Sequence, residues 1–151
     1  MDRQQVFQEA GKNDYSGLSP IRSTRCYRYE GLVKYIASHY VTVAEIGIGH
    51  FPDVAFALLE RGVRVFATDI RPFQYLGLRV IRDDITNPVI SLYGSVELLY
   101  FLKPPPELIP YMVQLARTLV ADLIVKPLAS EYPGGHLKLH GNTTFFLWND
   151  L

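Results

Sequence analysis

The sequence predicts a doubly wound α/β fold, with a mainly parallel sheet that is followed by a C-terminal β-hairpin. Short β-branched, apolar runs alternate with segments whose apolar residues recur at helical spacing. Two glycines lie where the first predicted strand ends and the next helix begins. Because alternating strands and helices form parallel sheets through right-handed crossovers, these observations together predict the doubly wound arrangement.

Length and composition predict one packed domain. The chain has 151 residues, of which we expect residues 26–151 to form the domain and the polar residues 1–25 to form a flexible arm. Hydrophobic residues make up 48%, and fifteen basic residues balance fifteen acidic ones, so nucleic acid and anionic membranes are disfavoured as partners. Cys26 is the only cysteine, which excludes an intrachain disulfide and suggests a cytoplasmic protein. No apolar stretch reaches the roughly 20 residues that span a bilayer.

The first half of the predicted domain holds two helices and two strands. Apolar residues at helical spacing predict an amphipathic helix over residues 29–39, and a β-branched run predicts a buried strand over residues 41–46. Pro52 suits the first turn of the next helix, since its missing N–H would have no intrahelical partner there, and Gly62 suits the position just past the end of that helix. Residues 63–68 predict a second strand, parallel to the first.

The connection to the third strand is short. Only residues 70–77 separate the second strand from a third predicted strand at residues 78–81, whereas parallel crossovers usually take a dozen or more residues. We therefore expect the usual crossover helix to be reduced to about one turn. The later predicted elements are a short helix at 88–93, a strand at 96–102, a helix at 107–119, a strand at 123–125, and a hairpin that pairs 137–139 with 144–148.

The glycines mark a candidate ligand site. Ligands of doubly wound sheets bind outside the carboxyl ends of the strands, where the strand order reverses, and the exit of the first strand carries Gly47 and Gly49. Glycine permits a tight turn and a close approach of ligand to backbone. A dinucleotide motif needs a third glycine where Pro52 stands, and Asp53 would repel a phosphate at the helix N-terminus. S-adenosylmethionine carries no phosphate, so the sequence favours this cofactor over NAD.

Carboxylates at three strand ends are predicted to converge on the same ligand. Glu45 precedes the glycine turn and can balance an ammonium or sulfonium charge. Asp69 ends the second strand about 20 residues beyond the glycines, where an acidic residue accepts both ribose hydroxyls. After the third strand, either Asp83 or Asp84 can accept the adenine amino group, and we favour Asp84 because it lies just before the cap at Thr86.

Two segments, 43–49 and 65–69, resemble the first two motifs of class I S-adenosylmethionine-dependent methyltransferases. More closely, the chain from about Tyr29 to its end resembles an uncharacterised, mostly archaeal family of small, Rossmann-like proteins of methyltransferase type. Its recognisable stretches are 45–53, 68–71, 82–86 and 104–108. The resemblance implies an adenosyl cofactor but brings no established activity. Together with the reasoning above it predicts a cofactor-binding set of Glu45, Gly47, Ile48, Gly49, Asp69, Ile70 and Asp84.

One position departs from the methyltransferase pattern. Where those enzymes usually have a third glycine, this chain has Phe51, whose ring would narrow the pocket. We therefore keep two alternatives beside the favoured hypothesis, an S-adenosylmethionine-binding protein and possible methyltransferase whose methyl acceptor is unknown. The first is a non-enzymatic interaction module with a degenerate cofactor pocket, and the second, less favoured, is an NAD-binding oxidoreductase.

The sequence assigns no catalytic residue. Lys103 and three prolines follow the fourth strand, where methyltransferases place substrate-facing residues, but the motif typical of amine methylation is altered there. Lys126 and His50 are further candidates at the same end of the sheet. His136 and His140 share one face of a predicted strand without a recognised metal-ligand spacing, so no metal site is predicted.

Overall fold

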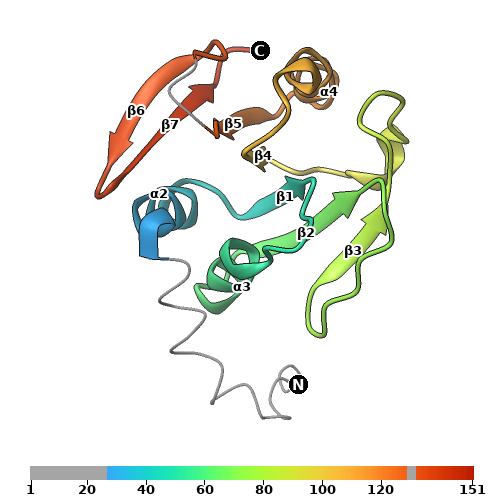
Figure 1. Cartoon of the computed structure of the whole chain (residues 1–151), viewed down its shortest axis with the longest axis horizontal. Helices are drawn as coiled ribbons and strands as arrows, with labels where there is room; N and C mark the ends of the chain where they lie inside the picture. The colour runs from blue at the N-terminus through green and yellow to red at the C-terminus, as the bar shows by residue number, and fades with distance from the viewer. Residues whose placement is uncertain (1–26, 129–131) are drawn as a thin grey trace.

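The structure, a computed structural model, describes residues 27–128 and 132–151 (Figure 1). The predicted flexible arm and Cys26 lie outside these residues. The helical elements are η1 (Tyr27–Tyr29), α2 (Glu30–His39), α3 (Asp53–Glu60), η2 (Ile90–Leu92), η3 (Pro106–Leu108) and α4 (Ile109–Leu119). The strands are β1 (Thr42–Ile46), β2 (Arg64–Asp69), β3 (Arg79–Arg82), β4 (Leu98–Leu102), β5 (Asp122–Lys126), β6 (His136–His140) and β7 (Thr143–Trp148).

Within the described residues, seven strands form one sheet in the order β3-β2-β1-β4-β5-β7-β6. The strands β3, β2, β1, β4 and β5 are parallel, and β7 runs antiparallel to both of its neighbours, β5 and β6. The order reverses at β1, which has β2 on one side and β4 on the other. The predicted doubly wound sheet with a C-terminal hairpin is confirmed.

Helices cover both faces of the sheet (Figure 1). On one face, α2 and α3 bury Leu32, Ile36 and Leu58 against the strands, each with no exposed area. On the other face, α4 buries Met112 and Leu115 against β4 and β5. Fully burying such a side chain stabilises the fold by roughly 1.5–3 kcal/mol. The helices on the two faces therefore hold the strands, and with them the strand ends where a ligand would bind.

The connection between β2 and β3 has no crossover helix, and the single helical turn that its length led us to expect is also absent from residues 70–78. Residues 70–78 form turns and bends with one isolated bridge, between Tyr75 and Leu78. Two helix starts differ slightly from the sequence-based expectation. Pro52 is the N-cap residue of α3 rather than its first helical residue, and only Ile90–Leu92 of the predicted helix 88–93 forms a helical turn, of the 3-10 type. Helix ends fray and are often 3-10 turns, so differences of one or two residues at a helix boundary are usual.

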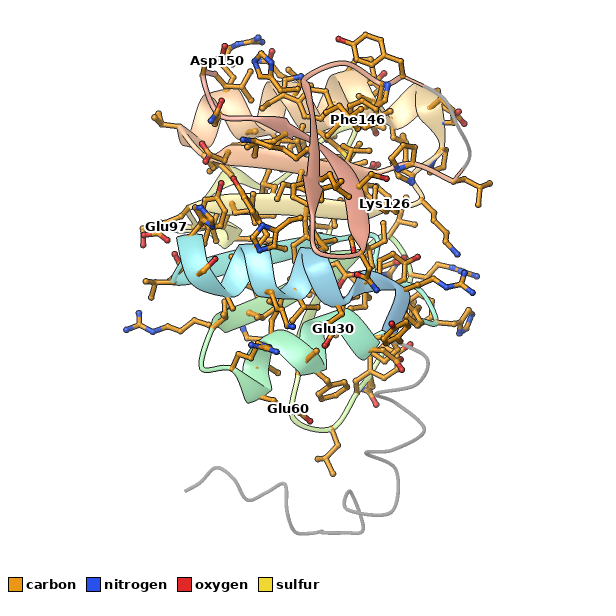
Figure 2. All side chains as sticks on the ribbon, turned by 90° about the vertical axis from the view of Figure 1, so that its left-hand side faces the viewer. Glu30, Glu60, Glu97, Lys126, Phe146 and Asp150 are labelled. Carbon is orange, nitrogen blue, oxygen red and sulfur yellow. The ribbon has the colours of Figure 1, made fainter. Side chains whose placement is uncertain are left out.

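The hairpin turn caps the first helix (Figure 2). The Gly31 N–H donates to the side chains of Asn142 and Thr143, at 2.9 and 3.1 Å, so these residues act as N-caps from the other end of the chain. Gly31 also permits the close approach, because a Cβ there would collide with the His140 carbonyl. None of the helices among the described residues is long and apolar enough to cross a membrane.

Candidate functional site

Two hollows open at the carboxyl ends of the parallel strands. The larger hollow, of about 540 Å³, is bordered by the ends of β2, β3 and β4 and includes Asp69. The smaller hollow, of about 310 Å³, includes Glu45 of β1. Gly47, Leu102 and Lys103 border both hollows, so one elongated ligand can span them. This is the end of the sheet, next to the reversal at β1, where the fold class places ligands.

The turn between β1 and α3 requires its glycines. Gly47 and Gly49 have φ of +68° and +53°, a conformation that costs about 1–2 kcal/mol for a residue with a Cβ. A Cβ on Gly47 would also lie 2.5 Å from the ring of Phe101. The N–H groups of Gly47 and Ile48 both donate to the Thr68 carbonyl, at 2.8 and 3.2 Å. The turn is thus tied to the end of β2, and its first two amides are used within the protein.

Asp69 fastens the same turn from the other side. Its Oδ2 accepts the Gly49 N–H at 2.9 Å and its Oδ1 accepts the Arg71 N–H at 3.0 Å. The Tyr75 hydroxyl donates to the Gly49 carbonyl at 2.5 Å, so both backbone groups of Gly49 are held. A carboxylate oxygen has two lone pairs, and Asp69 therefore keeps acceptor capacity for ribose hydroxyls.

The two acids after β3 have different partners. Asp83 accepts the Val89 N–H on Oδ1 at 3.1 Å and the Tyr93 hydroxyl on Oδ2 at 2.6 Å, so both of its oxygens hold the segment that leads to β4. Asp84 accepts the hydroxyl and the N–H of Thr86, both on Oδ1, and these bonds hold the pKa of Asp84 below its usual range. Both acids border the larger hollow. Each oxygen of Asp83 thus has a described bond, whereas both described bonds of Asp84 are on Oδ1.

Glu45 has a buried carboxyl, of which 1% is exposed. The Tyr100 hydroxyl donates to its Oε1 at 2.7 Å. Burial raises the pKa of Glu45 well above its usual value; the bond from Tyr100 lowers it, and the nearby charge of buried Asp53 raises it further. The buried position thus disfavours the charged form of this acid, which a positive charge in the smaller hollow would favour.

The apolar members of the predicted set lie in different surroundings. The Ile48 side chain is 3% exposed and packs in a core cluster, whereas Ile70 is 60% exposed at the border of the larger hollow. Among the described residues, Phe51 borders only the smaller hollow, where its ring centroid lies 5.5 Å from that of Tyr29. The expected narrowing by Phe51 therefore affects the hollow of Glu45 and leaves that of Asp69 open.

Several wall residues of the larger hollow were not predicted. They are apolar or hydroxylated residues: Thr68, Phe101 and Leu102 at strand ends, Ile85 in the segment after β3, and Leu108 in η3 after β4. Their positions after strands were available as a signal. Their residue types are those of core positions, so sequence alone gave no reason to assign them to a ligand site.

Lys103 lies at the boundary of the hollows in a left-handed conformation, with φ of +54°. Its N–H donates to the Lys126 carbonyl at 2.6 Å. Lys126 itself places Nζ 3.3 Å from the Thr144 hydroxyl, and burial lowers the pKa of its ammonium group. His50 is exposed and meets the Phe73 ring edge-on, with ring centroids 4.9 Å apart. Of these candidates, Lys103 is the one that borders both hollows.

The histidines of the hairpin are remote from the hollows. His136 and His140 belong to β6, which β7 and β5 separate from β4. The His140 ring packs against Tyr35, with centroids 5.4 Å apart. Within residues 27–128 and 132–151, no group of three or more His, Cys, Asp or Glu is arranged to hold a metal ion. Cys26 and Glu131 lie outside those residues.

The strand order, the antiparallel β7 and the glycine turn define a methyltransferase-like Rossmann fold, and solved structures share it. MtNAS in complex with MTA and tNA matches with a TM-score of 0.62 and 21% identity, over 88% of this chain and 64% of that one. A SAM-dependent methyltransferase from Archaeoglobus fulgidus matches with a TM-score of 0.53 and 16% identity, over 82% and 57%. The chain thus spans less than two thirds of the length of these proteins, and the likeness concerns the fold alone.

The chain belongs to the uncharacterised protein family UPF0146, whose pattern matches residues 29–148. The UPF0146 protein of Archaeoglobus fulgidus is 38% identical over 118 residues, which are 77% of this chain and 91% of that protein. The UPF0146 protein of Methanocaldococcus jannaschii is 40% identical over 101 residues, 64% of this chain and 74% of that protein. The resemblance to an archaeal, methyltransferase-like family is confirmed.

Proposed function

We propose that this protein binds S-adenosylmethionine, with the adenosyl group in the larger hollow and the amino-acid end in the smaller one. Asp69 accepts the ribose hydroxyls and Asp84 the adenine amino group, beside the exposed apolar surface of Ile70. The ligand crosses between the hollows at Gly47, which borders both, and Glu45 faces its positive charge. The observation that carries this proposal is a pair of hollows joined at Gly47, each with a carboxyl group of the predicted set.

The hydrogen bonds of the glycine turn weigh against a dinucleotide. A pyrophosphate is bound by free N–H groups at such a turn and at the start of its helix. Here the N–H groups of Gly47 and Ile48 donate to the Thr68 carbonyl, and that of Gly49 donates to Asp69. S-adenosylmethionine has no pyrophosphate to be bound there, which supports it over NAD.

We further propose methyl transfer as the reaction class, in the cytoplasm. Methyl transfer needs chiefly the alignment of an acceptor with the sulfonium, so a catalytic base is not required. Lys103 borders both hollows, and the sulfonium of a ligand that spans them would lie near this boundary. Lys103 is therefore the residue we place beside the acceptor, whose identity stays open.

A second function has one specific observation in its favour. Phe51 packs against Tyr29 within the lining of the smaller hollow, and a methyltransferase usually has glycine at this position. A protein that had lost its cofactor and kept the fold as an interaction module would show such packing. Ligand binding separates the two proposals directly.

The test is titration calorimetry of the full chain with S-adenosylmethionine, S-adenosylhomocysteine and NAD. We expect saturable binding of the first two ligands and none of NAD. In NMR titrations, the amide signals of Gly49 and Arg71 should move, because both amides are bonded to Asp69. Absence of heat with both adenosyl ligands at millimolar concentration would contradict cofactor binding and leave the interaction module, while tight NAD binding would reverse the order of preference.

A further inference from the structure

The smaller hollow combines a buried acidic residue with exposed basic residues. Its lining includes Glu45, which is 1% exposed, and two exposed basic residues, Arg28 and Lys103. Aromatic rings of Tyr29 and Phe51 complete one wall. A buried acid with basic groups at the mouth complements a ligand that has both an ammonium and a carboxylate group.

Arg28 is fixed at this place by the far end of the chain. It lies in η1, and its carbonyl accepts the Thr143 hydroxyl at 3.1 Å, while the neighbouring Tyr27 carbonyl accepts the Asn142 amide at 2.9 Å. The hairpin turn therefore holds the main chain of η1, and the guanidinium extends from an anchored backbone. A main chain that is already anchored needs no further ordering when a ligand binds.

We propose that Arg28 binds the α-carboxylate of the ligand's amino-acid end and so makes the site specific for ligands that carry this end. The inference rests on the proposed function. Guanidinium matches a carboxylate with two parallel N–H bonds, which a lysine ammonium cannot reproduce. Of the two hollows, Arg28 borders only the smaller one, whereas Lys103 also borders the larger one, where we place the nucleoside. We therefore prefer Arg28 to Lys103 for this role.

The test compares two ligands that share the nucleoside and the sulfur. S-adenosylhomocysteine has the amino-acid end, and 5′-methylthioadenosine lacks it. By titration calorimetry, Arg28→Ala should weaken binding of S-adenosylhomocysteine about 10- to 100-fold, as expected for a charge-assisted bond, and change that of methylthioadenosine less than about twofold. The affinity of Arg28→Lys for S-adenosylhomocysteine should lie between those of the wild-type protein and Arg28→Ala. Lys34→Ala, which removes an exposed cation from α2, is the matched control and should leave both affinities unchanged.

Each outcome decides the proposal. A selective loss of S-adenosylhomocysteine binding supports it. Equal losses for both ligands, or none, overturn the role of Arg28, and wild-type protein that binds the two ligands equally shows that the amino-acid end is not recognised although the adenosyl site exists. If the wild-type protein binds neither ligand, the proposed function and this inference fail together. Melting temperatures of the variants exclude a loss of fold as the cause.

Discussion

The two hollows use acidic side chains in opposite ways. In the smaller hollow, Glu45 is in the core, and burial raises its pKa well above the usual value. In the larger hollow, Asp84 is bonded to Thr86 at the surface, and its pKa is lowered. Burial at one end of the site and hydrogen bonding at the other thus shift the pKa of the same chemical group in opposite directions.

This difference predicts two kinds of response. The larger hollow is built from surface turns whose acids are already bonded, so it is ready to accept neutral hydroxyl and amino groups. The smaller hollow carries a desolvated acid whose charged form a cation would stabilise further. We expect changes in the first to affect nucleoside binding, and changes in the second to affect stability, pH dependence and the recognition of the amino-acid end.

The largest effect is expected where the hollows meet. Gly47→Ala places a Cβ against the Phe101 ring at a positive φ, and we expect a loss of about 2–4 kcal/mol in the free energy of unfolding, measured by chemical denaturation. Gly62→Ala is the matched control: its φ is +85°, but nothing lies within 4 Å of an added Cβ, so only the backbone strain should appear. Equal losses in both variants would contradict the contact with Phe101.

Removal of the acid at the end of β2 should be next in size. Asp69→Ala loses the bonds from Gly49 and Arg71 and the proposed ribose acceptor, so the affinities for S-adenosylhomocysteine and methylthioadenosine should fall together, by about 10- to 100-fold. Calorimetry measures both. Asp150→Ala removes an exposed acid near the C-terminus and should change neither affinity. A loss confined to S-adenosylhomocysteine would place Asp69 at the wrong end of the ligand.

Glu45→Gln should stabilise the fold while it weakens recognition of the amino-acid end. Because the folded-state pKa is raised, the native state holds more protons than the unfolded state above about pH 4.5, and wild-type stability falls as pH rises towards the folded pKa. The glutamine oxygen still accepts the Tyr100 hydroxyl, so the variant escapes this loss. We expect a gain on the order of 1 kcal/mol, or about 2–4 °C in melting temperature, at pH 8 and almost none at pH 5.

Thermal melting of both proteins across pH checks this expectation, and two parallel stability curves would contradict a buried, proton-holding Glu45. Calorimetry on the same samples completes the test. The Glu45→Gln variant should lose affinity for S-adenosylhomocysteine and keep that for methylthioadenosine, since only the first ligand carries an ammonium group.

The smallest effect is expected at the rim of the larger hollow. Asp84→Ala should weaken both adenosyl ligands by only about three- to tenfold, the value of one hydrogen bond to the adenine amino group. Asp83→Ala should instead lower the melting temperature, since Asp83 holds Val89 and Tyr93. If Asp83→Ala reduced affinity more than Asp84→Ala without loss of stability, the two assignments would have to be exchanged.

The sequence predicted most of the strands and helices and the end of the sheet at which the two hollows lie. Periodicity fixed the alternation of elements, the residue count between Asp69 and Arg79 excluded an ordinary crossover helix, and the reversal at β1 was expected from the glycine turn. The predicted polar residues do border the two hollows. The sequence did not predict that these residues line two separate hollows. It also did not predict apolar lining residues such as Phe101 and Leu108, whose residue types do not differ from those of the core.

The sequence by itself determined what depends on neighbours along the chain: which segments become strands, where glycine frees the turn, and which strands end in acids. Tertiary structure alone decided what depends on distant partners. The raised pKa of Glu45 needs the strands packed around it, and the hydrogen bond to its carboxyl comes from Tyr100, 55 residues away. The place of Arg28 needs Thr143, 115 residues away, and such contacts leave no local pattern because burial and long-range bonds arise only when the sheet closes around them.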